Sequence, residues 1–119
     1  MIKGIGLDIV EIERIRKLIH QSEKFHKRIL SEREQKIFHQ LSDKRKCEFL
    51  AGRFAAKEAF SKANGTGIRE GCEFHQIEIL NDELGKPVLY FHGQAVNGFV
   101  SITHSRDYAA AQVLLMMDS

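Results

Sequence analysis

Apolar and polar residues alternate over residues 2–10, and the period then changes to one apolar position every three or four residues up to about residue 64. The alternation predicts a β-strand. One face of this strand carries branched apolar side chains and the other carries two glycines and an aspartate: Ile5, Leu7 and Ile9 oppose Gly4, Gly6, Asp8 and Val10. Because a carboxylate within an apolar strand needs a partner, we expect Asp8 to meet a cation or hydrogen-bond donors, although it could also cap the following helix.

The helical period predicts three helices and a short helical turn in the first half of the chain. The first helix covers residues 11–20, the turn lies near residues 25–30, and Ser31 with Glu34 forms a capping box that starts the second helix. Ser42 is placed to cap a long central helix over residues 43–64, and Asn64-Gly65 supplies the left-handed residue that ends it.

The second half of the chain has the pattern of strands. We expect strands over residues 74–80, 88–91, 99–104 and 108–116, joined by turns at 81–87 and 105–107. Helices in the N-terminal half therefore pack on a mainly antiparallel sheet, which is an α+β fold. A chain of 119 residues has room for one core, so residues 1–119 are expected to form a single domain.

The central helix carries Arg53, Lys57, Glu58 and Lys62 between two apolar faces. A surface helix gathers its charged residues on one outer face, so this helix is expected to be packed on more than one side. Two explanations stay open for its charges. Either the charged side chains form i,i+4 pairs and lay their aliphatic stems along the apolar surface, or they belong to a binding site.

Composition narrows the classes of function. The chain has 43% hydrophobic and 29% charged residues, as soluble globular proteins do, and no apolar run approaches the ~20 residues that span a bilayer. The N-terminal segment lacks the features of a signal peptide, and Cys47 and Cys72 lack metal-binding spacing, so we expect two reduced thiols in a cytoplasmic protein. A net charge of +2 argues against a dedicated nucleic-acid binder.

Two groups of residues could carry chemistry. Asp8 and Glu58 are carboxylates of the kind that bind Mg²⁺ while leaving positions for water and substrate phosphates. Cationic side chains and a glycine turn suit phosphate oxygens: Lys44, Arg45, Arg53, Lys57 and Lys62 with Gly65-Thr66-Gly67. His104 is expected to bind a ligand or to be a satisfied polar group rather than to activate a nucleophile, because no G-x-S-x-G elbow is present. The combination indicates metal-assisted chemistry on a phosphorylated substrate.

Four segments together resemble a known family. They are GIGLDIVEIERI from residue 4, EFLAGRFAAKEAFSKANGTGI from residue 48, GKP at 85–87 and SITHSRDYAAAQV from residue 101. Their order and spacing resemble the holo-[acyl-carrier-protein] synthases, the small bacterial class of 4'-phosphopantetheinyl transferases. The resemblance implies that family's fold and the transfer of 4'-phosphopantetheine from coenzyme A to a serine of apo acyl carrier protein. It also implies adenosine 3',5'-bisphosphate as the second product and a part in fatty acid biosynthesis.

The same resemblance implies roles for individual residues. Asp8 and Glu58 would hold Mg²⁺, and Lys62 would hold the phosphates beside it, which makes these three the expected catalytic residues. The site for coenzyme A, the donor substrate, would comprise Lys44, Arg45, Arg53, Lys62, Gly65 and His104. Of these, Lys44, Arg45 and Arg53 would hold the 3'-phosphate. The serine hydroxyl would lose its proton either to a metal-bound water or to one of the carboxylates.

The resemblance extends to assembly and partners. It implies a homotrimer with active sites between subunits, in which one apolar face of the central helix lies near a second subunit and His104 and Asp8 of one site belong to different chains. The acidic carrier protein is expected to meet Arg14, Leu18, Phe25 and Arg28, and no nucleic acid or membrane is expected as a partner. Two alternatives are a Mg²⁺-dependent nuclease, which the low net charge disfavours, and a non-catalytic module that binds coenzyme A or carrier protein.

Overall fold

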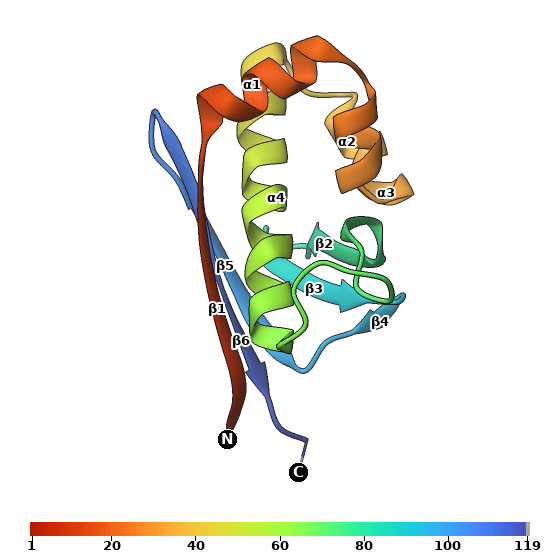
Figure 1. Ribbon diagram of the computed structural model, residues 1–119, viewed down its shortest axis with the longest axis vertical. Helices are drawn as coiled ribbons and strands as arrows, with labels where there is room; N and C mark the ends of the chain where they lie inside the picture. The colour runs from red at the N-terminus through yellow and green to blue at the C-terminus, as the bar shows by residue number, and fades with distance from the viewer. Residues whose placement is uncertain (119) are drawn as a thin grey trace.

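A long central helix organises the computed structural model, which describes residues 1–118. This helix, α4 (Asp43–Asn64), has one sheet on one side and shorter helices with a second sheet on the other (Figure 1). The first sheet has the strand order β1–β6–β5 and the second has the order β2–β3–β4. All strand pairs in both sheets are antiparallel, so the expected α+β class is confirmed.

The elements follow one another in the expected order, with two differences. The helices before α4 are α1 (Ile12–Gln21), α2 (Lys24–Ile29) and α3 (Glu32–Phe38). The strands are β1 (Ile2–Glu11), β2 (Ile77–Asn81), β3 (Pro87–Phe91), β4 (Gln94–Ala95), β5 (Gly98–His104) and β6 (Tyr108–Met116). Residues Phe74–Gln76 form a 3₁₀ turn rather than the start of a strand, and the short strand β4 lies where a loop was expected. None of the helices within residues 1–118 combines the length and apolar character needed to cross a membrane.

Both ends of α4 are fixed by local chemistry. The Ser42 side chain accepts a hydrogen bond from the Arg45 amide at 3.3 Å, which satisfies one of the free N–H groups of the first turn. Gly65 follows the last turn with φ of 83°, a left-handed conformation that glycine adopts without a steric penalty. The helix start and end predicted from the sequence are therefore confirmed.

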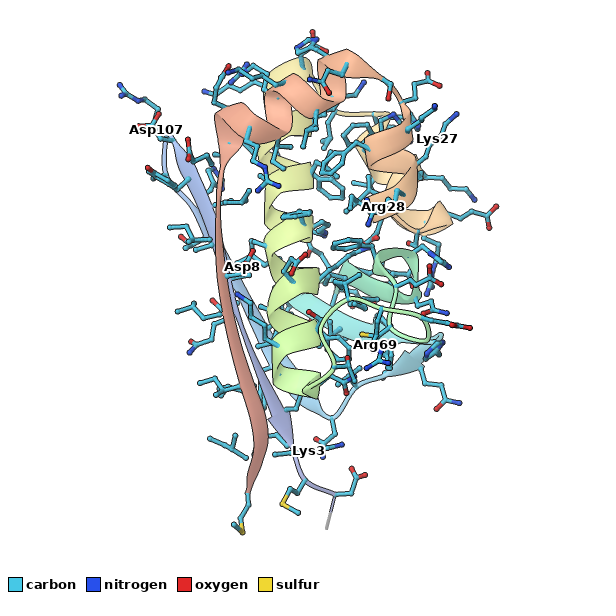
Figure 2. The ribbon with its side chains drawn as sticks, viewed as in Figure 1. Lys3, Asp8, Lys27, Arg28, Arg69 and Asp107 are labelled. Atoms are coloured by element: carbon cyan, nitrogen blue, oxygen red, sulfur yellow. The ribbon has the colours of Figure 1, made fainter. Side chains whose placement is uncertain are left out.

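Strand β1 approaches α4 closely through its glycines. A Cβ added to Gly6 would lie 1.8 Å from the Ala59 carbonyl oxygen, and one added to Gly4 would lie 2.1 Å from the Ala63 carbonyl oxygen. The helix backbone therefore occupies the space where side chains of an ordinary strand would stand. Asp8 follows on the same face of the strand and lies beside α4 (Figure 2).

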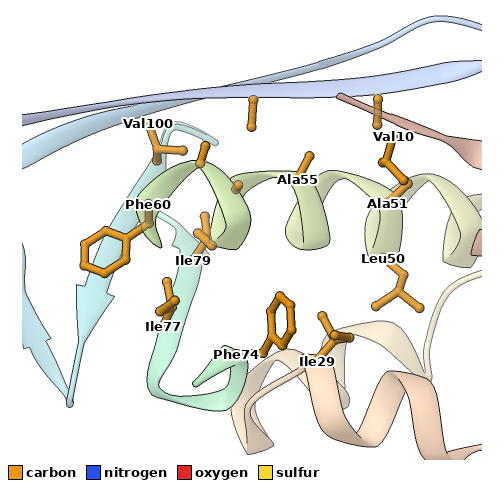
Figure 3. Close-up of a cluster of buried hydrophobic side chains, with 14 of the residues drawn as sticks. Val10, Ile29, Leu50, Ala51, Ala55, Phe60, Phe74, Ile77, Ile79 and Val100 are labelled. Atoms are coloured by element: carbon orange, nitrogen blue, oxygen red, sulfur yellow. The ribbon is translucent and has the colours of Figure 1, made fainter. Parts of the chain in front are cut away.

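The hydrophobic core surrounds α4. Ala51 and Ala55 are fully buried and face the first sheet, whereas Leu50 faces α2 and the second sheet (Figure 3). On that second side Leu50 packs in one cluster with Ile29 and Phe74. Both apolar faces of α4 are thus covered by the same chain. The expectation that one of them lies near a second subunit is not needed to explain the helix pattern.

The outer face of the first sheet is apolar and exposed. Ile5, Leu7 and Ile9 of β1 are 58%, 63% and 65% exposed, and Phe99 of β5 is 55% exposed. The branched face of β1 therefore points to solvent, while the glycine face points into the protein. A contiguous exposed apolar face marks a surface where another chain or a ligand binds.

Candidate active site

Three predicted site residues meet where β1 packs on the C-terminal half of α4. The Lys62 ammonium donates hydrogen bonds to Asp8 Oδ1 at 3.1 Å and to the Leu7 carbonyl oxygen at 3.0 Å. Glu58 is half-buried and lies one helical turn before Lys62, so it shares the same face of α4. We call Asp8, Glu58 and Lys62 the carboxylate cluster.

The electrostatics of this cluster favour a bound cation. Burial raises the pKa of Glu58, and the negative charge of Asp8 raises it further, against the opposite effect of Lys62 and of two nearby arginines. Within residues 1–118, no three or more His, Cys, Asp or Glu side chains gather into a metal site. A cation bound here would take two protein carboxylates and fill its other positions with water or substrate oxygens, which is how Mg²⁺ usually binds. The donor set therefore fits Mg²⁺.

Aromatic rings border the carboxylate cluster. The rings of Phe25, Phe54 and Phe74 lie in a row, with centroid separations of 5.9 and 5.5 Å. The Arg14 guanidinium lies 5.8 Å from the centroid of Phe54, and the Arg28 guanidinium lies 5.6 Å from that of Phe74. Both arginines also lower the pKa of the glutamate in the cluster, so their charges act at the site. We call these five residues the aromatic strip.

A second group of predicted residues lines a cavity of about 180 Å³ beside the N-terminal half of α4. Arg45, Arg53 and His104 contribute to its wall, together with Glu48, Phe49, Gly52, Asn81 and Ile102. His104 Nε2 lies 3.5 Å from Glu48 Oε2, and Arg45 Nε lies 3.9 Å from Glu48 Oε1. Two arginines and a histidine around one cavity suit a phosphate group. We call this site the arginine cavity.

Arg53 is the most buried cation of the arginine cavity. It is 8% exposed, and its guanidinium carbon lies 4.4 Å from the centroid of the Phe49 ring. Its Nε is buried and has no hydrogen-bond partner within residues 1–118. Burial lowers the pKa of Arg53, and the charge of Glu34 opposes this effect. Because this Nε is enclosed by protein and faces Glu34, an anion in the arginine cavity would meet the terminal guanidinium nitrogens of Arg53 rather than its Nε.

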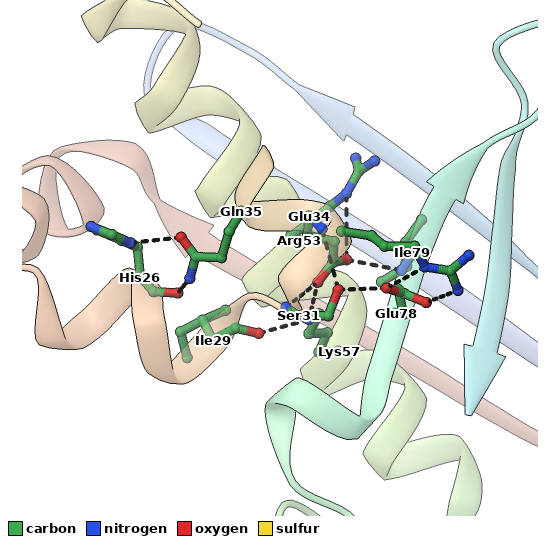
Figure 4. Close-up of polar contacts among 10 residues, drawn as sticks. His26, Ile29, Ser31, Glu34, Gln35, Arg53, Lys57, Glu78 and Ile79 are labelled. Carbon is green, nitrogen blue, oxygen red and sulfur yellow. Dashed lines mark hydrogen bonds and ion pairs between the residues drawn. The ribbon is translucent and has the colours of Figure 1, made fainter. Parts of the chain in front are cut away.

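The remaining cation of α4, Lys57, is fully buried and forms an ion pair with Glu34 (Figure 4). Its Nζ donates to Glu34 Oε1 at 2.5 Å and to the Ile29 carbonyl oxygen at 2.6 Å. Glu34 also accepts hydrogen bonds from the amides of Ser31 and Ile79, each at 2.9 Å. Lys57 and Lys62 therefore pair with carboxylates of other elements rather than with their i,i+4 neighbours.

Two residues expected in the coenzyme A site lie apart from the arginine cavity. Lys44 is exposed on the first turn of α4 and does not belong to the residues that line the cavity. Gly65 follows the last turn, three residues after Lys62, and a Cβ built there would meet nothing within 4 Å. The described role of Gly65 is thus to end α4 near the carboxylate cluster.

The carboxylate cluster and the arginine cavity lie at opposite edges of the first sheet. Asp8 belongs to β1 and His104 to β5, and β6 lies between these strands. Along α4, Arg53 and Lys62 are nine residues apart, which places them about 180° apart around the helix axis. One chain therefore presents the two halves of the expected site in different directions.

Sequence reasoning missed the acidic partners of these cations. Glu34 was recognised only as part of a capping box, and Glu48 was not singled out. Their contacts depend on how α3, α4 and β5 pack, and hydrophobic periodicity does not report such contacts. One signal was available, because Lys57 lies between buried alanines and a lysine in such a position requires a carboxylate.

Known sequences resemble this chain over almost its full length. The model of the 4'-phosphopantetheinyl transferase superfamily matches residues 4–113. The holo-[acyl-carrier-protein] synthase of Geobacillus sp. (strain WCH70) is 60% identical, over 97% of this chain and 97% of its own. That of Bacillus pumilus (strain SAFR-032) is 57% identical, over 97% of this chain and 96% of its own.

Solved structures give the same result. The holo-(acyl-carrier-protein) synthase of Bacillus anthracis str. Ames, in complex with CoA (3',5'-ADP), has a TM-score of 0.86 at 49% identity and covers 97% of this chain and 96% of its own. The Helicobacter pylori synthase in complex with coenzyme A has a TM-score of 0.81 at 33% identity and covers 94% and 99%. The similarity therefore includes both sheets and all four helices.

Proposed function

This chain belongs to the 4'-phosphopantetheinyl transferase superfamily, and we propose that it transfers the 4'-phosphopantetheine group of coenzyme A to a serine of apo acyl carrier protein. The products are holo acyl carrier protein and adenosine 3',5'-bisphosphate, so the reaction supports fatty acid biosynthesis in the cytoplasm. The observation that carries this proposal is the meeting of Asp8, Glu58 and Lys62 in a chain 60% identical to a holo-[acyl-carrier-protein] synthase. Residues 1–119 act as one transferase domain.

The carboxylate cluster is the proposed catalytic centre. Asp8 and Glu58 would hold Mg²⁺, which when bound supplies positive charge to stabilise the phosphate that leaves. Lys62 is half exposed beside Asp8, so its ammonium is placed to donate hydrogen bonds to the pyrophosphate of the substrate. The serine hydroxyl would lose its proton to a metal-bound water or to one of the two carboxylates.

The arginine cavity is the proposed site for the 3'-phosphate of coenzyme A. Arg45, Arg53 and His104 line one cavity, so two guanidinium groups and an imidazole surround the space where a phosphate would lie. Lys44 and Gly65 complete the proposed coenzyme A site from the two ends of α4, with Lys44 adding charge at the cavity side. Arginine suits this role because its planar fork binds phosphate oxygens in pairs.

We place the complete site between subunits of a homotrimer. The two halves of the site lie at opposite edges of the first sheet, so a single coenzyme A molecule would contact Asp8 of one chain and His104 of the next. Joining one edge to the opposite edge of a second copy is a head-to-tail contact, and such contacts form a closed ring when the rotation between copies is a whole fraction of a turn, here one third. The exposed apolar face that includes Ile5, Leu7 and Ile9 supplies the surface to be buried.

The aromatic strip and the neighbouring Leu18 form the proposed docking surface for carrier protein. Arg14 and Arg28 offer positive charge to an acidic partner, while Leu18 and Phe25 are half-buried and offer apolar contact. Charge complementarity of this kind speeds encounter and orients the partner. The surface adjoins Glu58, so a docked carrier protein would present its serine to the carboxylate cluster.

The deciding experiment is a carrier-modification assay. The protein is incubated with coenzyme A, Mg²⁺ and an apo carrier protein, and intact-mass spectrometry should show addition of the phosphopantetheine mass to the carrier. Glu58→Gln should abolish the mass change without unfolding the protein, whereas Glu32→Gln, at an exposed glutamate of α3, should leave it intact. Binding of coenzyme A without any mass change would favour the non-catalytic module, and Mg²⁺-dependent plasmid cleavage would favour the nuclease.

A further inference from the structure

Three charged side chains are buried together between α3 and α4. Lys57 and Glu34 are each 0% exposed, and Arg53 is 8% exposed. A fourth buried charge, Glu78 at 8% exposed, lies beside them and pairs with Arg33. Charges in such surroundings are expensive unless each has a partner. The contacts of Glu34 therefore show which of the two cations neutralises it.

Glu34 is already satisfied without Arg53. Its Oε1 accepts from Lys57 Nζ at 2.5 Å and from the Ser31 amide, and its Oε2 accepts from the Ile79 amide at 2.9 Å. Arg53 Nε lies 4.0 Å from Glu34 Oε2, which is too long for a hydrogen bond. Lys57 thus holds the short contact with Glu34, and Arg53 makes only the 4.0 Å contact (Figure 4). Arg53 also lines the arginine cavity.

We propose that Lys57 is a positioning residue that neutralises Glu34 and so keeps Arg53 free to bind the 3'-phosphate of coenzyme A. This inference rests on the assignment of Arg53 to the 3'-phosphate given above. Without Lys57, the buried Glu34 carboxylate would lack a cation, and Arg53 is the nearest replacement. A movement of about 1 Å would turn the 4.0 Å separation into a hydrogen bond and withdraw Arg53 from the cavity.

Two donor substrates separate this role from a merely structural one. Coenzyme A carries the 3'-phosphate, and dephospho-coenzyme A lacks it but contains the same reacting pyrophosphate. The preference is the ratio of kcat/KM for the two donors in the carrier-modification assay. General damage to the fold lowers both values, whereas loss of a phosphate ligand lowers only the value for coenzyme A. Arg53→Met should show the largest loss of preference for coenzyme A, about ten- to a hundredfold for one charge-assisted hydrogen bond.

The proposal predicts a loss and a rescue. Lys57→Met should reduce the preference for coenzyme A by about tenfold, mainly through KM, because Glu34 captures Arg53. The double variant Lys57→Met/Glu34→Gln removes both charges of the pair, so Arg53 is released and the preference should return to within about threefold of the original. Where Lys57→Met does not fold, Lys57→Gln takes its place, since it retains a donor for the Ile29 carbonyl.

The outcomes distinguish the inference from the function on which it rests. If Arg53→Met leaves the preference for coenzyme A over dephospho-coenzyme A unchanged, Arg53 does not bind the 3'-phosphate. If Arg53→Met abolishes the preference but the Lys57 variant keeps it, the role proposed for Lys57 is wrong and that of Arg53 stands. Failure of the double variant to regain the preference, in a protein that unfolds at the same denaturant concentration as the single variant, would also overturn it.

Discussion

Replacing Gly6 by alanine should push β1 away from α4 and separate Asp8 from Lys62. The added Cβ would lie 1.8 Å from the Ala59 carbonyl oxygen and 2.9 Å from the Ala63 amide nitrogen. Cβ contacts under 3.0 Å are essentially never found, and the obstructing atoms belong to the backbone of a packed helix. The strand must therefore move by more than about 1 Å, because a close-packed interior has no void that could absorb the methyl group.

A displacement of this size should affect catalysis more than stability. Overpacking a core costs about 1–3 kcal/mol of free energy of unfolding, which a domain of ordinary stability survives. Misplacing a catalytic group by about 1 Å costs roughly a hundredfold in rate. We therefore expect Gly6→Ala to fold, with its free energy of unfolding lowered by ~2 kcal/mol, and to modify carrier protein about 100-fold more slowly.

Gly4→Ala is the matched control. Its Cβ would lie 2.1 Å from the Ala63 carbonyl oxygen, so the steric conflict is similar, but Gly4 is four residues from Asp8 rather than two. Rates are measured by mass spectrometry of the carrier at saturating Mg²⁺, and stabilities by urea unfolding. The two variants should lose similar stability, and Gly6→Ala should lose much more activity. Losses of activity that merely follow the losses of stability would refute the positional explanation.

Three further outcomes follow from other contacts. Glu34→Ala leaves Lys57 and Arg53 buried without a carboxylate, so urea unfolding should show a loss of about 3–5 kcal/mol, and a loss below about 1 kcal/mol would contradict the buried pairing. Arg14→Glu should raise the KM for carrier protein, and an unchanged KM at low ionic strength would exclude Arg14 from docking. Burial lowers the pKa of His26, so the unfolded chain takes up a proton first as the pH falls. Stability should therefore be constant above pH ~6.5 and decrease below it, and His26→Phe should show less of this decrease in denaturant titrations between pH 5 and 8.

Local chemistry made much of the fold predictable. The alternation around Asp8 predicted β1, and Ser42 and Gly65 predicted both ends of α4, because caps and strand periods depend on neighbouring residues alone. The 3₁₀ turn at Phe74 was missed because its apolar residues also fit a strand. The sequence did not indicate which face of β1 is buried, since glycines rarely make the inner face of a strand.

The site was predictable where its residues share a short spacing on one element. Glu58 and Lys62 are four residues apart on α4, and Asp8 was an evident carboxylate in an apolar strand. The partner of Lys57 was not predictable, because Glu34 reaches it only through the packing of α3 on α4. The separation of the arginine cavity from the carboxylate cluster depends on strand order, which the residue pattern does not give. Only the family resemblance implied it, by assigning Asp8 and His104 of one site to different chains.

The pairing of β1 with β6 links the carboxylate cluster to the order in which the chain is synthesised. Leu7 pairs with Gln112 and Asp8 with Ala111, so β1 finds its partner only after roughly a hundred further residues have been synthesised, which takes about 5–20 s. Until then β1 lacks the strand hydrogen bonds that β6 supplies. A nascent or prematurely terminated chain that lacks β6 therefore cannot hold Asp8 beside Lys62, and the carboxylate cluster forms only at the last stage of folding.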